Sequence, residues 1–283
     1  MVTRKQIAAD LRKLGIRRGD ILEVHSSLKA VGRVQGGPKA VIRAFQVLIG
    51  TSGTLLMPVL SYCYTQLREV FAHATSPSKV GLITETFRTM PGVVRSCCPT
   101  HSVAAWGRRA VELTMHHALT APIGVGSPLH LAALAGGKVV LLGCTQKTNS
   151  FLHVVEALTG HPAYLDTPIY GDTAQIRMPD GMIKTVQTRS QTGDSRNFIA
   201  LEPFLERSGL IAHGLVGAAP TQVMVGQAVI DCLVPILKKR PELPLCKPGT
   251  CNSCDLRHAV IQEEAAKSKG TTKAGKGRAG NKG

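Results

Sequence analysis

The sequence predicts an α/β protein, because short apolar runs of strand type alternate with longer stretches in which apolar residues recur at helical spacing. The clearest example runs from 138 to 160. A continuous apolar run with β-branched members ends there in small and polar residues, which predicts a buried strand followed by a loop. After that loop, Leu152, Val155 and Leu158 recur at helical spacing and Gly160 supplies a left-handed stop, so a helix follows.

Two earlier segments repeat this order. The runs at 21–25 (ILEVH) and 54–59 (TLLMPV) are further buried strands, and Thr3 caps an amphipathic helix before them. A Ser- and Gly-rich loop follows the first of these strands, and a helix then starts at Pro38. Strand, glycine loop and helix in this order form a cradle for phosphate, since backbone N–H groups and a helix amino terminus attract anions. The spacing is neither a Walker loop nor a dinucleotide fingerprint, so a plain turn and linker stays an alternative.

The other elements follow in order. A polar loop extends to about Ser78, a helix runs from Gly81 to Met90, and 91–107 holds a turn, a short strand and the polar segment PTHS. His101 lies in that segment, where a structural hydrogen-bonded histidine is the favoured interpretation of the residue taken alone. We expect further helices at 110–118, 129–134, 201–207 and 220–239, and a hairpin at 174–186 with Pro179-Asp180-Gly181 as its turn.

The helix after the loop at 148–150 carries His153 and Glu156, which are three residues apart and therefore project from one face. A carboxylate at this spacing orients an imidazole and raises its basicity, which makes His153 a candidate general base. The alternative is a core histidine beside a solvated glutamate. The position at the carboxyl end of a buried strand favours a functional role, because open α/β sheets bind their ligands there.

Length and composition restrict the other possibilities. The 283 residues make one large α/β domain or two small ones, and with 43% apolar but only 4% aromatic residues the interior is filled mostly by Leu, Val, Ile and Ala. We find neither a signal peptide nor a long uninterrupted apolar run, so we expect a cytoplasmic protein with no membrane partner. Five dispersed cysteines are expected to be reduced and mostly buried: Cys63, Cys97, Cys98, Cys144 and Cys232.

The last part of the chain changes character. Cys246, Cys251, Cys254 and His258 form C-x4-C-x2-C-x3-H, which can supply three thiolates and an imidazole to tetrahedral zinc. The loops are short and there is no second CxxC, so free or redox-active surface cysteines are favoured over a metal site. After Glu264 no large apolar residue occurs. We therefore expect a domain at 1–240, a cysteine-containing extension at 241–264 and a disordered basic tail at 265–283.

The chain is strongly basic. Of its formal net charge of +16, six charges belong to the last seventeen residues and +10 to the rest. Such a charge raises the question of nucleic acid or another polyanion. The low aromatic content and the absence of a nucleic-acid-binding module argue against sequence-specific nucleic-acid binding. A polyanion-binding protein that uses the basic body and tail is one alternative function.

Six ordered stretches resemble the aminoglycoside 3-N-acetyltransferase family, also called antibiotic N-acetyltransferases, over about residues 4–240. They are VHSSLKAVGRVQGG (24–37), GTLLMPVLSY (53–62), PGVVRSCCPTHSVAAWG (91–107), PIGVGSP (122–128), VVLLGCTQKTNSFLHVVE (139–156) and GLVGAAPTQVM (214–224). The resemblance implies a single three-layer α/β/α domain with a mixed sheet. It also implies transfer of an acetyl group from acetyl-coenzyme A to an amine of an aminoglycoside or an aminoglycoside-like small molecule. No metal is required, and a homodimer is left open.

By this resemblance the catalytic helix carries His153 and Glu156, and the PTHS segment adds His101. The amine would attack the thioester directly, with His153 as base; a covalent nucleophile, Cys144 or Cys98, is the alternative. Thr100 and Ser102 are expected to line the channel for the pantetheine arm. The family's glycine-rich loop, which would hold the coenzyme, falls on His25, Ser26, Ser27, Leu28, Val31, Gly32, Gly36 and Gly37.

Three positions depart from the family pattern. Lys147 and Ala72 stand where drug-modifying members often have Asp, and Cys98-Pro99 stands where they read His-Pro. Each ammonium of an aminoglycoside needs a counter-charge as it loses water. We therefore expect better activity toward a less cationic amine, as in a biosynthetic acyltransferase, than toward highly charged drugs.

Overall fold

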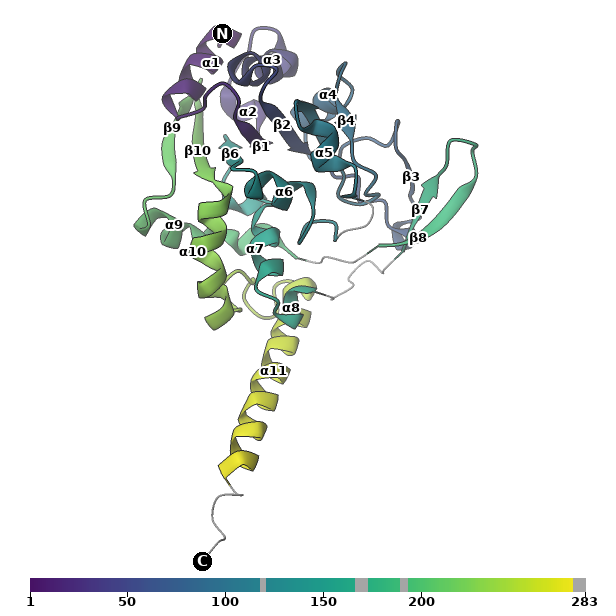
Figure 1. Cartoon of the computed structure of the whole chain (residues 1–283), viewed down its shortest axis with the longest axis vertical. Helices are drawn as coiled ribbons and strands as arrows, with labels where there is room; N and C mark the ends of the chain where they lie inside the picture. Colours follow the sequence, from purple (N-terminus) through teal and green to yellow (C-terminus); the bar gives the residue numbers. More distant parts are fainter. Residues whose placement is uncertain (118–120, 166–172, 189–192, 277–283) are drawn as a thin grey trace, which may run out of the picture.

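A seven-stranded mixed sheet forms the centre of the molecule (Figure 1). The structure, a computed structural model, describes residues 1–117, 121–165, 173–188 and 193–276, with side chains up to Lys267. In the strand order β4-β5-β2-β1-β6-β10-β9, the middle strands β2, β1 and β6 are parallel and antiparallel strands flank them on both sides. This confirms the predicted mixed sheet. The strands are β1 Ile21–Ser26, β2 Thr54–Pro58, β4 Val94–Arg95, β5 Val103–Gly107, β6 Lys138–Leu142, β9 Ala212–Val216 and β10 Ala219–Val225.

Helices cover both faces of this sheet, so the predicted three layers are confirmed. Successive strand residues point to opposite faces. Leu55 and Met57 lie in the core under one helix layer, whereas Leu56 lies in the core under the other. The first layer contains α1 Arg4–Lys13, α2 Leu28–Val31, α3 Gly37–Ile49 and α4 Leu82–Arg88. The second contains α5 Ala110–Thr114, α6 Pro128–Leu134, α7 Leu152–Leu158, α9 Glu202–Arg207 and α10 Gly226–Lys239.

The helix predicted at 220–239 is wrong in its first part. Residues 219–225 form β10, which pairs antiparallel with β6 on one side and with β9 on the other, and only Gly226–Lys239 is helical. Consecutive residues of β10 serve opposite cores, Val223 the first and Met224 the second. Because this part of the strand is buried on both faces of the sheet, its apolar residues do not alternate with polar ones as in a strand with one exposed face. Hydrophobic periodicity alone therefore did not distinguish β10 from the helix that follows it.

A smaller sheet lies beside the main one. It joins β3 Val70–Ala72, β7 Thr173–Arg177 and β8 Ile183–Gln187, with β3 parallel to β7. The β7–β8 pair is the predicted hairpin. β3 lies within the segment expected to be only a polar loop, which also contains the short helix η1 Thr65–Leu67.

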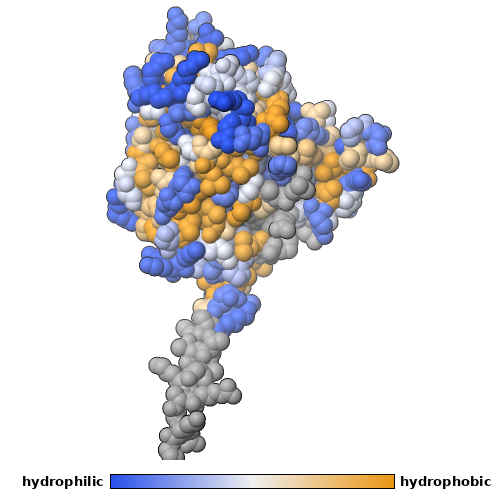
Figure 2. All heavy atoms as spheres, in the orientation of Figure 1, coloured by the Kyte–Doolittle hydropathy of each residue, from blue (hydrophilic) through white to orange (hydrophobic). Residues whose placement is uncertain are grey.

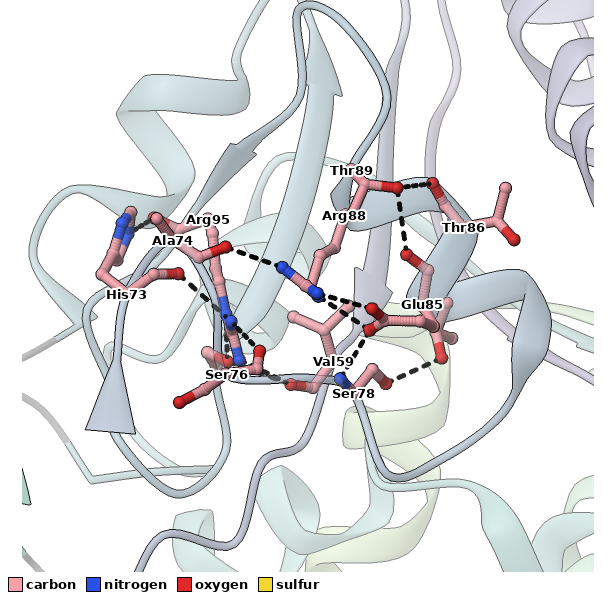
Figure 3. Close-up of polar contacts among 12 residues, drawn as sticks. Val59, His73, Ala74, Ser76, Ser78, Glu85, Thr86, Arg88, Thr89 and Arg95 are labelled. Carbon is pink, nitrogen blue, oxygen red and sulfur yellow. Dashed lines mark hydrogen bonds and ion pairs between the residues drawn. The ribbon is translucent and has the colours of Figure 1, made fainter. Parts of the chain in front are cut away.

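Arg95 of β4 holds this segment against the main sheet (Figure 3). Its guanidinium donates to the carbonyl oxygens of Ser76 at 2.5 Å, His73 at 3.2 Å and Val59 at 3.4 Å. Burial lowers the pKa of Arg95 to about 10, so the side chain keeps its charge at neutral pH. One buried cation therefore stabilises two backbone carbonyls of this segment together with that of Val59, the residue after β2.

The chain ends in the helix α11 Asn252–Lys276, which begins against α8 Pro162–Leu165 and then extends away from the body (Figure 1). In the structure α11 continues through residues 265–276, a range that the sequence predicts as part of a disordered tail, and that boundary stays a prediction. Residues 277–283, which the same prediction covered, lie outside the described residues. No helix in the described part of the chain is both long and apolar enough to span a bilayer.

Candidate active site

α7 starts at the carboxyl end of β6, as the sequence predicts. Between them lies the short helix η3 Gln146–Thr148, and the buried Asn149 fixes the junction. Its side chain donates to Gln146 Oε1 at 2.7 Å and accepts from the backbone N–H of Phe151 at 3.2 Å. The first turn of α7 is therefore held firmly at the sheet edge where ligands bind in α/β proteins.

His153 and Glu156 meet on this helix. Nδ1 of His153 lies 2.7 Å from Oε2 of Glu156, and the two residues are 8% and 0% exposed, so the alternative of a solvated glutamate is wrong. A carboxylate only accepts hydrogen bonds, so it fixes the proton on Nδ1 and the lone pair of the neutral ring on Nε2. The ring also packs edge-on against Phe198, with centroids 4.7 Å apart. This geometry is that of an oriented general base.

Arg257 of α11 is a third member of this group, and the sequence analysis missed it. Its Nη1 donates to Oε1 of Glu156 at 3.1 Å, and both side chains are almost fully buried. The guanidinium also stacks over the ring of Tyr164, 5.4 Å from the centroid. It comes from the extension, 101 residues along the chain from Glu156. No local spacing could have linked the two residues.

Gly193 packs against the group formed by His153, Glu156 and Arg257. A Cβ atom at this position would lie 2.3 Å from Cε1 of His153 and 3.0 Å from Nη1 of Arg257. Since real Cβ atoms do not approach so closely, only glycine fits there without displacing the ring. The backbone at 193 therefore limits where the imidazole can lie.

Burial and neighbouring charges together set the protonation states of Glu156 and His101. Burial raises the pKa of Glu156, but the charges of Arg257 and His153 and their hydrogen bonds lower it below its ordinary value, so Glu156 is ionised. Burial, with smaller contributions from His153 and His117, lowers the pKa of His101 to about 3. His101 is therefore neutral at physiological pH.

A cavity of about 940 Å³ brings His101 and His153 together. The Tyr62 and Tyr64 rings stand edge-on to His101, with centroids 5.4 and 6.3 Å from its own. Residues of the extension form another part of the wall. The cavity is lined by Leu60, Tyr62, Tyr64, Leu67, Lys79, His101, Ile123, Ser150, His153, Gly193, Asp194, Ser195, Arg196, Thr250, Cys251, Asn252 and Ser253.

The two neighbours of His101 lie behind this wall. Ser102 is buried, donates to Val59 O at 3.0 Å and accepts from Arg95 Nε at 2.9 Å. Thr100 is also buried, with Oγ1 3.0 Å from Nδ1 of His101. Both hydroxyls thus position the segment, and a direct contact of either with a pantetheine arm stays a prediction.

The glycine-rich loop starts at the same sheet edge. Ser26 of β1 is level with Leu142 of β6, and Ser27 donates its N–H to Leu142 O at 2.8 Å. His25 is buried and bonded to Glu23 Oε1 at 2.8 Å, and Val31 is buried in the core. The polar part of the loop is thus nearest the catalytic helix, while two of the residues predicted to bind coenzyme have structural contacts. Leu28 is half-buried, and Gly32, Gly36 and Gly37 have positive φ angles of 92°, 85° and 58°.

A basic hollow of about 530 Å³ adjoins Gly36. It lies between the starts of α1 and α3, where Figure 2 shows hydrophilic side chains gathered at the top of the molecule. Four cations line it: Arg4, Lys5, Lys39 and Arg43. Together with the left-handed backbone at Gly36, this hollow suits a phosphate group.

Known proteins are similar to this chain in sequence and in fold. Residues 24–238 match the family described as aminoglycoside 3-N-acetyltransferase. The chain belongs to this family. It is therefore an acyltransferase by kinship, and the catalytic helix, the PTHS segment and the glycine-rich loop all lie within the matched range.

Two curated relatives span nearly the same length. Aminoglycoside N(3)-acetyltransferase III of Serratia marcescens is 30% identical over 268 residues, which cover 84% of this chain and 98% of the relative. Aminoglycoside N(3)-acetyltransferase VII of Streptomyces paromomycinus is 31% identical over 263 residues, covering 81% and 89%.

Solved structures agree. Aminoglycoside acetyltransferase AAC(3)-IVa, as a histidine-to-alanine mutant in complex with a gentamicin, matches with a TM-score of 0.81 and 26% identity, covering 92% of this chain and 98% of that one. AAC-IIIb with CoASH matches with a TM-score of 0.75 and 29% identity, covering 87% and 99%.

Two positions expected to depart from the family pattern are not on the described cavity wall. Neither Lys147 nor Ala72 is among the residues that line the cavity. The charged groups that do line it are Lys79, Arg196 and Asp194, and two of these three are cations. Asp166 and Asp172 lie outside the described residues. The described wall is thus poor in negative charge.

Neither cysteine proposed as a nucleophile suits that role. Burial raises the pKa of the Cys98 thiol, whose sulfur lies 3.6 Å from Thr100 Oγ1. Burial also raises the pKa of Cys144. A thiol attacks as its thiolate, so both groups are poorly activated, and neither lines the cavity. The geometry favours direct transfer over a covalent intermediate.

Proposed function

We propose that this chain transfers an acetyl group from acetyl-coenzyme A to an amine of an aminoglycoside or an aminoglycoside-like small molecule. The observation that carries the proposal is the buried His153–Glu156 pair at the wall of a cavity that also holds His101. Family membership supports the acyl transfer, and the relatives named above support coenzyme A and an aminoglycoside as reactants.

His153 is the general base in this mechanism. Its Nε2 takes a proton from the acceptor amine as the nitrogen attacks the thioester carbonyl, so the ring becomes an imidazolium. Glu156, 2.7 Å away on the Nδ1 side, stabilises that positive charge. Arg257 acts through Glu156 as a positioning residue, because it keeps the carboxylate ionised while it is buried.

His101 serves as a neutral partner in the same cavity. Because its pKa is about 3, it neither competes with His153 for the amine proton nor adds positive charge near the acceptor. A neutral imidazole can still donate or accept one hydrogen bond at the cavity wall. We assign it to orienting the reactants.

The loop at 25–37 is the proposed coenzyme site, with its phosphates toward Gly36. The basic hollow supports this placement, since four cations and a left-handed backbone offer both charge and close approach. Replacing Gly36 by Val should weaken coenzyme A binding at least about tenfold, or about 1.4 kcal/mol. The matched control is Gly209→Val, which places the same side chain at a positive φ of 65° in open surroundings. Equal coenzyme affinity of the two variants by calorimetry would contradict the placement.

The acceptor is proposed to carry fewer positive charges than the common drugs. Asp194 is the one carboxylate among the described residues of the wall, and it is already paired with Arg196, so several ammonium groups would find too few partners. Uncompensated charges in a partly desolvated cleft cost several kcal/mol of specificity.

Thiol release from acetyl-coenzyme A tests the function directly. Turnover is measured with gentamicin, apramycin and a mono-amino sugar, with His153→Ala as the blank. We expect turnover in the wild type, highest with the less cationic amine. Coenzyme binding without turnover on any amine would refute acetyl transfer, and efficient turnover of gentamicin at micromolar KM would refute the preference alone.

A further inference from the structure

Three cysteines of the extension come together beside the active-site cavity. The sulfur atoms of Cys246, Cys251 and Cys254 all lie within 4.8 Å of one another. Cys254 is fully buried and the other two are half-buried, so the expectation of free surface cysteines is wrong for Cys254. Cys251 also lines the cavity. These thiols take no part in the mechanism proposed above.

A carboxylate lies next to the cluster. The Cys251 thiol donates to Oδ2 of Asp194 at 3.3 Å, and Asp194 belongs to another segment of the cavity wall. The same Oδ2 is paired with the exposed guanidinium of Arg196, which a metal ion would have to displace or share. Oδ1 of Asp194 accepts from the backbone N–H of Arg196 at 2.8 Å, which fixes its orientation. His258, the fourth ligand that the sequence spacing suggested, instead places Nε2 2.9 Å from the carbonyl oxygen of Cys246. The structure thus replaces the imidazole by a carboxylate.

The backbone between these cysteines is a compact turn. Thr250 donates both its N–H, at 3.2 Å, and its hydroxyl, at 2.6 Å, to Lys247 O. Gly249 has a φ of 79° and donates to Asp255 Oδ1 at 2.8 Å. The turn therefore brings Cys246 back toward the first turn of α11, where Cys251 and Cys254 are three residues apart. Ligands in structural metal knuckles are spaced in this way.

The hydrophobic core beneath this turn is very small. Its buried members are Tyr164, Leu245 and Cys254, with a few partly buried neighbours. So small a core rarely fixes a segment alone, and short domains commonly add a metal ion or disulfides. Yet the segment holds Arg257 in a buried ion pair, which requires precise placement.

We propose that Cys246, Cys251 and Cys254 bind a zinc ion as thiolates, with the carboxylate of Asp194 at the fourth position. A tetrahedral site with Zn–S bonds of about 2.3 Å has its sulfurs about 3.8 Å apart, so the cluster needs to contract by at most about 1 Å. Binding releases the thiol protons to solvent as the three Zn–S bonds form, and no oxidant is needed.

The zinc ion would fasten the extension to the wall of the active site. Cys254 and Arg257 are three residues apart on α11, so they are neighbours on one helix face. A metal held between α11 and Asp194 therefore keeps Arg257 against Glu156. This last consequence rests on the proposed function, whereas metal binding itself is independent of it.

Elemental analysis of the full chain tests the site without any substrate. The protein is produced in zinc-supplemented medium and purified with a reductant and no chelator. We expect about one zinc per chain in the wild type and in Cys232→Ser, a thiol on α10 outside the cluster, and almost none in Cys254→Ser. A zinc-free wild type, or a Cys251–Cys254 disulfide in the reduced preparation, overturns the proposal.

Cobalt provides a second measurement, in which the wild type alone tests the thiolate site. After zinc is removed by a chelator, Co²⁺ added to the wild type should give a thiolate-to-metal charge-transfer band and the visible bands of a tetrahedral site. Asp194→Asn should retain the charge-transfer band but change the visible bands, since only the fourth ligand is altered. Absence of the charge-transfer band refutes the thiolate site, and unchanged visible bands in Asp194→Asn refute the carboxylate assignment. Because no turnover is measured, failure here is distinct from failure of the acetyltransferase proposal.

Discussion

The catalytic helix and the C-terminal extension reach the same carboxylate, and they are held in different ways. α7 stands on the main sheet, and its Leu152, Val154 and Val155 belong to one of the two large cores. Arg257 of the extension pairs with Glu156, and the hydrophobic core of the extension has only three buried residues. The proposed base is therefore fixed by the body of the fold, whereas the charge that keeps its partner ionised comes from a sparsely packed segment.

This difference teaches that geometry and protonation are controlled by separate parts of the molecule. The hydrogen bond between His153 and Glu156 joins two residues of one helix, so its geometry does not require the extension. The ionisation of Glu156 at 0% exposure depends on a distant cation. Changes in α7 should therefore remove chemistry from a stable protein, and changes in the extension should alter stability and pH dependence together.

The largest effect is expected for His153→Ala. Losing the general base should lower kcat roughly 10²–10⁴-fold while the melting temperature stays close to that of the wild type. The control is His213→Ala, an exposed histidine of β9 that pairs with Glu206 and should keep full activity. Steady-state kinetics and thermal melts of both variants check this. A folded His153→Ala with a normal rate would transfer the role of base to His101 or to solvent.

Next comes Arg257→Met, which tests the extension. It leaves Glu156 buried without its cation, so the free energy of unfolding should fall by about 3–5 kcal/mol. The control, Arg240→Met, breaks the exposed pair with Glu242 and should change it by less than about 1 kcal/mol.

The pH profile of kcat distinguishes a positioning role for Arg257 from a merely structural one. Without Arg257 the pKa of Glu156 rises, so the acidic limb of the profile should move to higher pH. Arg257→Lys retains the charge and should restore the limb in part, even if Arg257→Met proves hard to fold. Unchanged stability and an unchanged profile in Arg257→Met would mean that the two regions are not coupled.

Acid unfolding should separate the contribution of two buried histidines from that of Glu156 by pH. The pKa values of His101, about 3, and His117, about 4, are below the ordinary 6.5, so the unfolded chain binds protons first and stability falls as pH drops below 6.5. The lowered pKa of Glu156 stabilises the fold above 4.5, and this contribution is lost as pH falls from 4.5 toward the folded value.

Denaturant midpoints between pH 3 and pH 7 check the assignment. Glu156→Gln should be less stable at neutral pH and show a flatter curve below 4.5, with its slope between 4.5 and 6.5 retained. A flatter curve across the whole range would show that the histidines, too, depend on Glu156.

The sequence predicted those features that depend on residues close together in the chain or on a regular spacing of apolar residues. Helix spacing was enough to pair His153 with Glu156, because residues three apart always share a face. The strand at 138–142 and its loop were predictable because a buried strand is apolar throughout. β10 was taken for helix because Val223 and Met224 are both buried, in opposite cores, which obscures the alternation of a strand. The contact of Thr100 and Ser102 with a pantetheine arm stays a prediction, and their described hydroxyls bond within the protein.

What the sequence could not predict is long-range assembly. Arg257 lies beyond the matched family range and has no spacing signal toward Glu156. The partnership of Asp194 with Cys251 likewise joins two segments far apart in the chain.

The smallest effect is expected from shortening the chain, and two lengths sharpen the comparison. Deleting residues 267–283 removes six positive charges and no large apolar side chain, and the ion pair it breaks, Lys267 with Glu264, is exposed. The free energy of unfolding should change by no more than about 0.5 kcal/mol, with normal turnover and weaker salt-sensitive binding to polyanions. Ending the chain before Cys251 additionally removes Arg257 and two of the clustered thiols, so stability should fall as in Arg257→Met. Thermal melts of the two truncations measure the contrast directly. A large loss from the shorter deletion would place the stabilising contacts in the basic tail, and equal stability of both would mean that the extension does not hold Glu156.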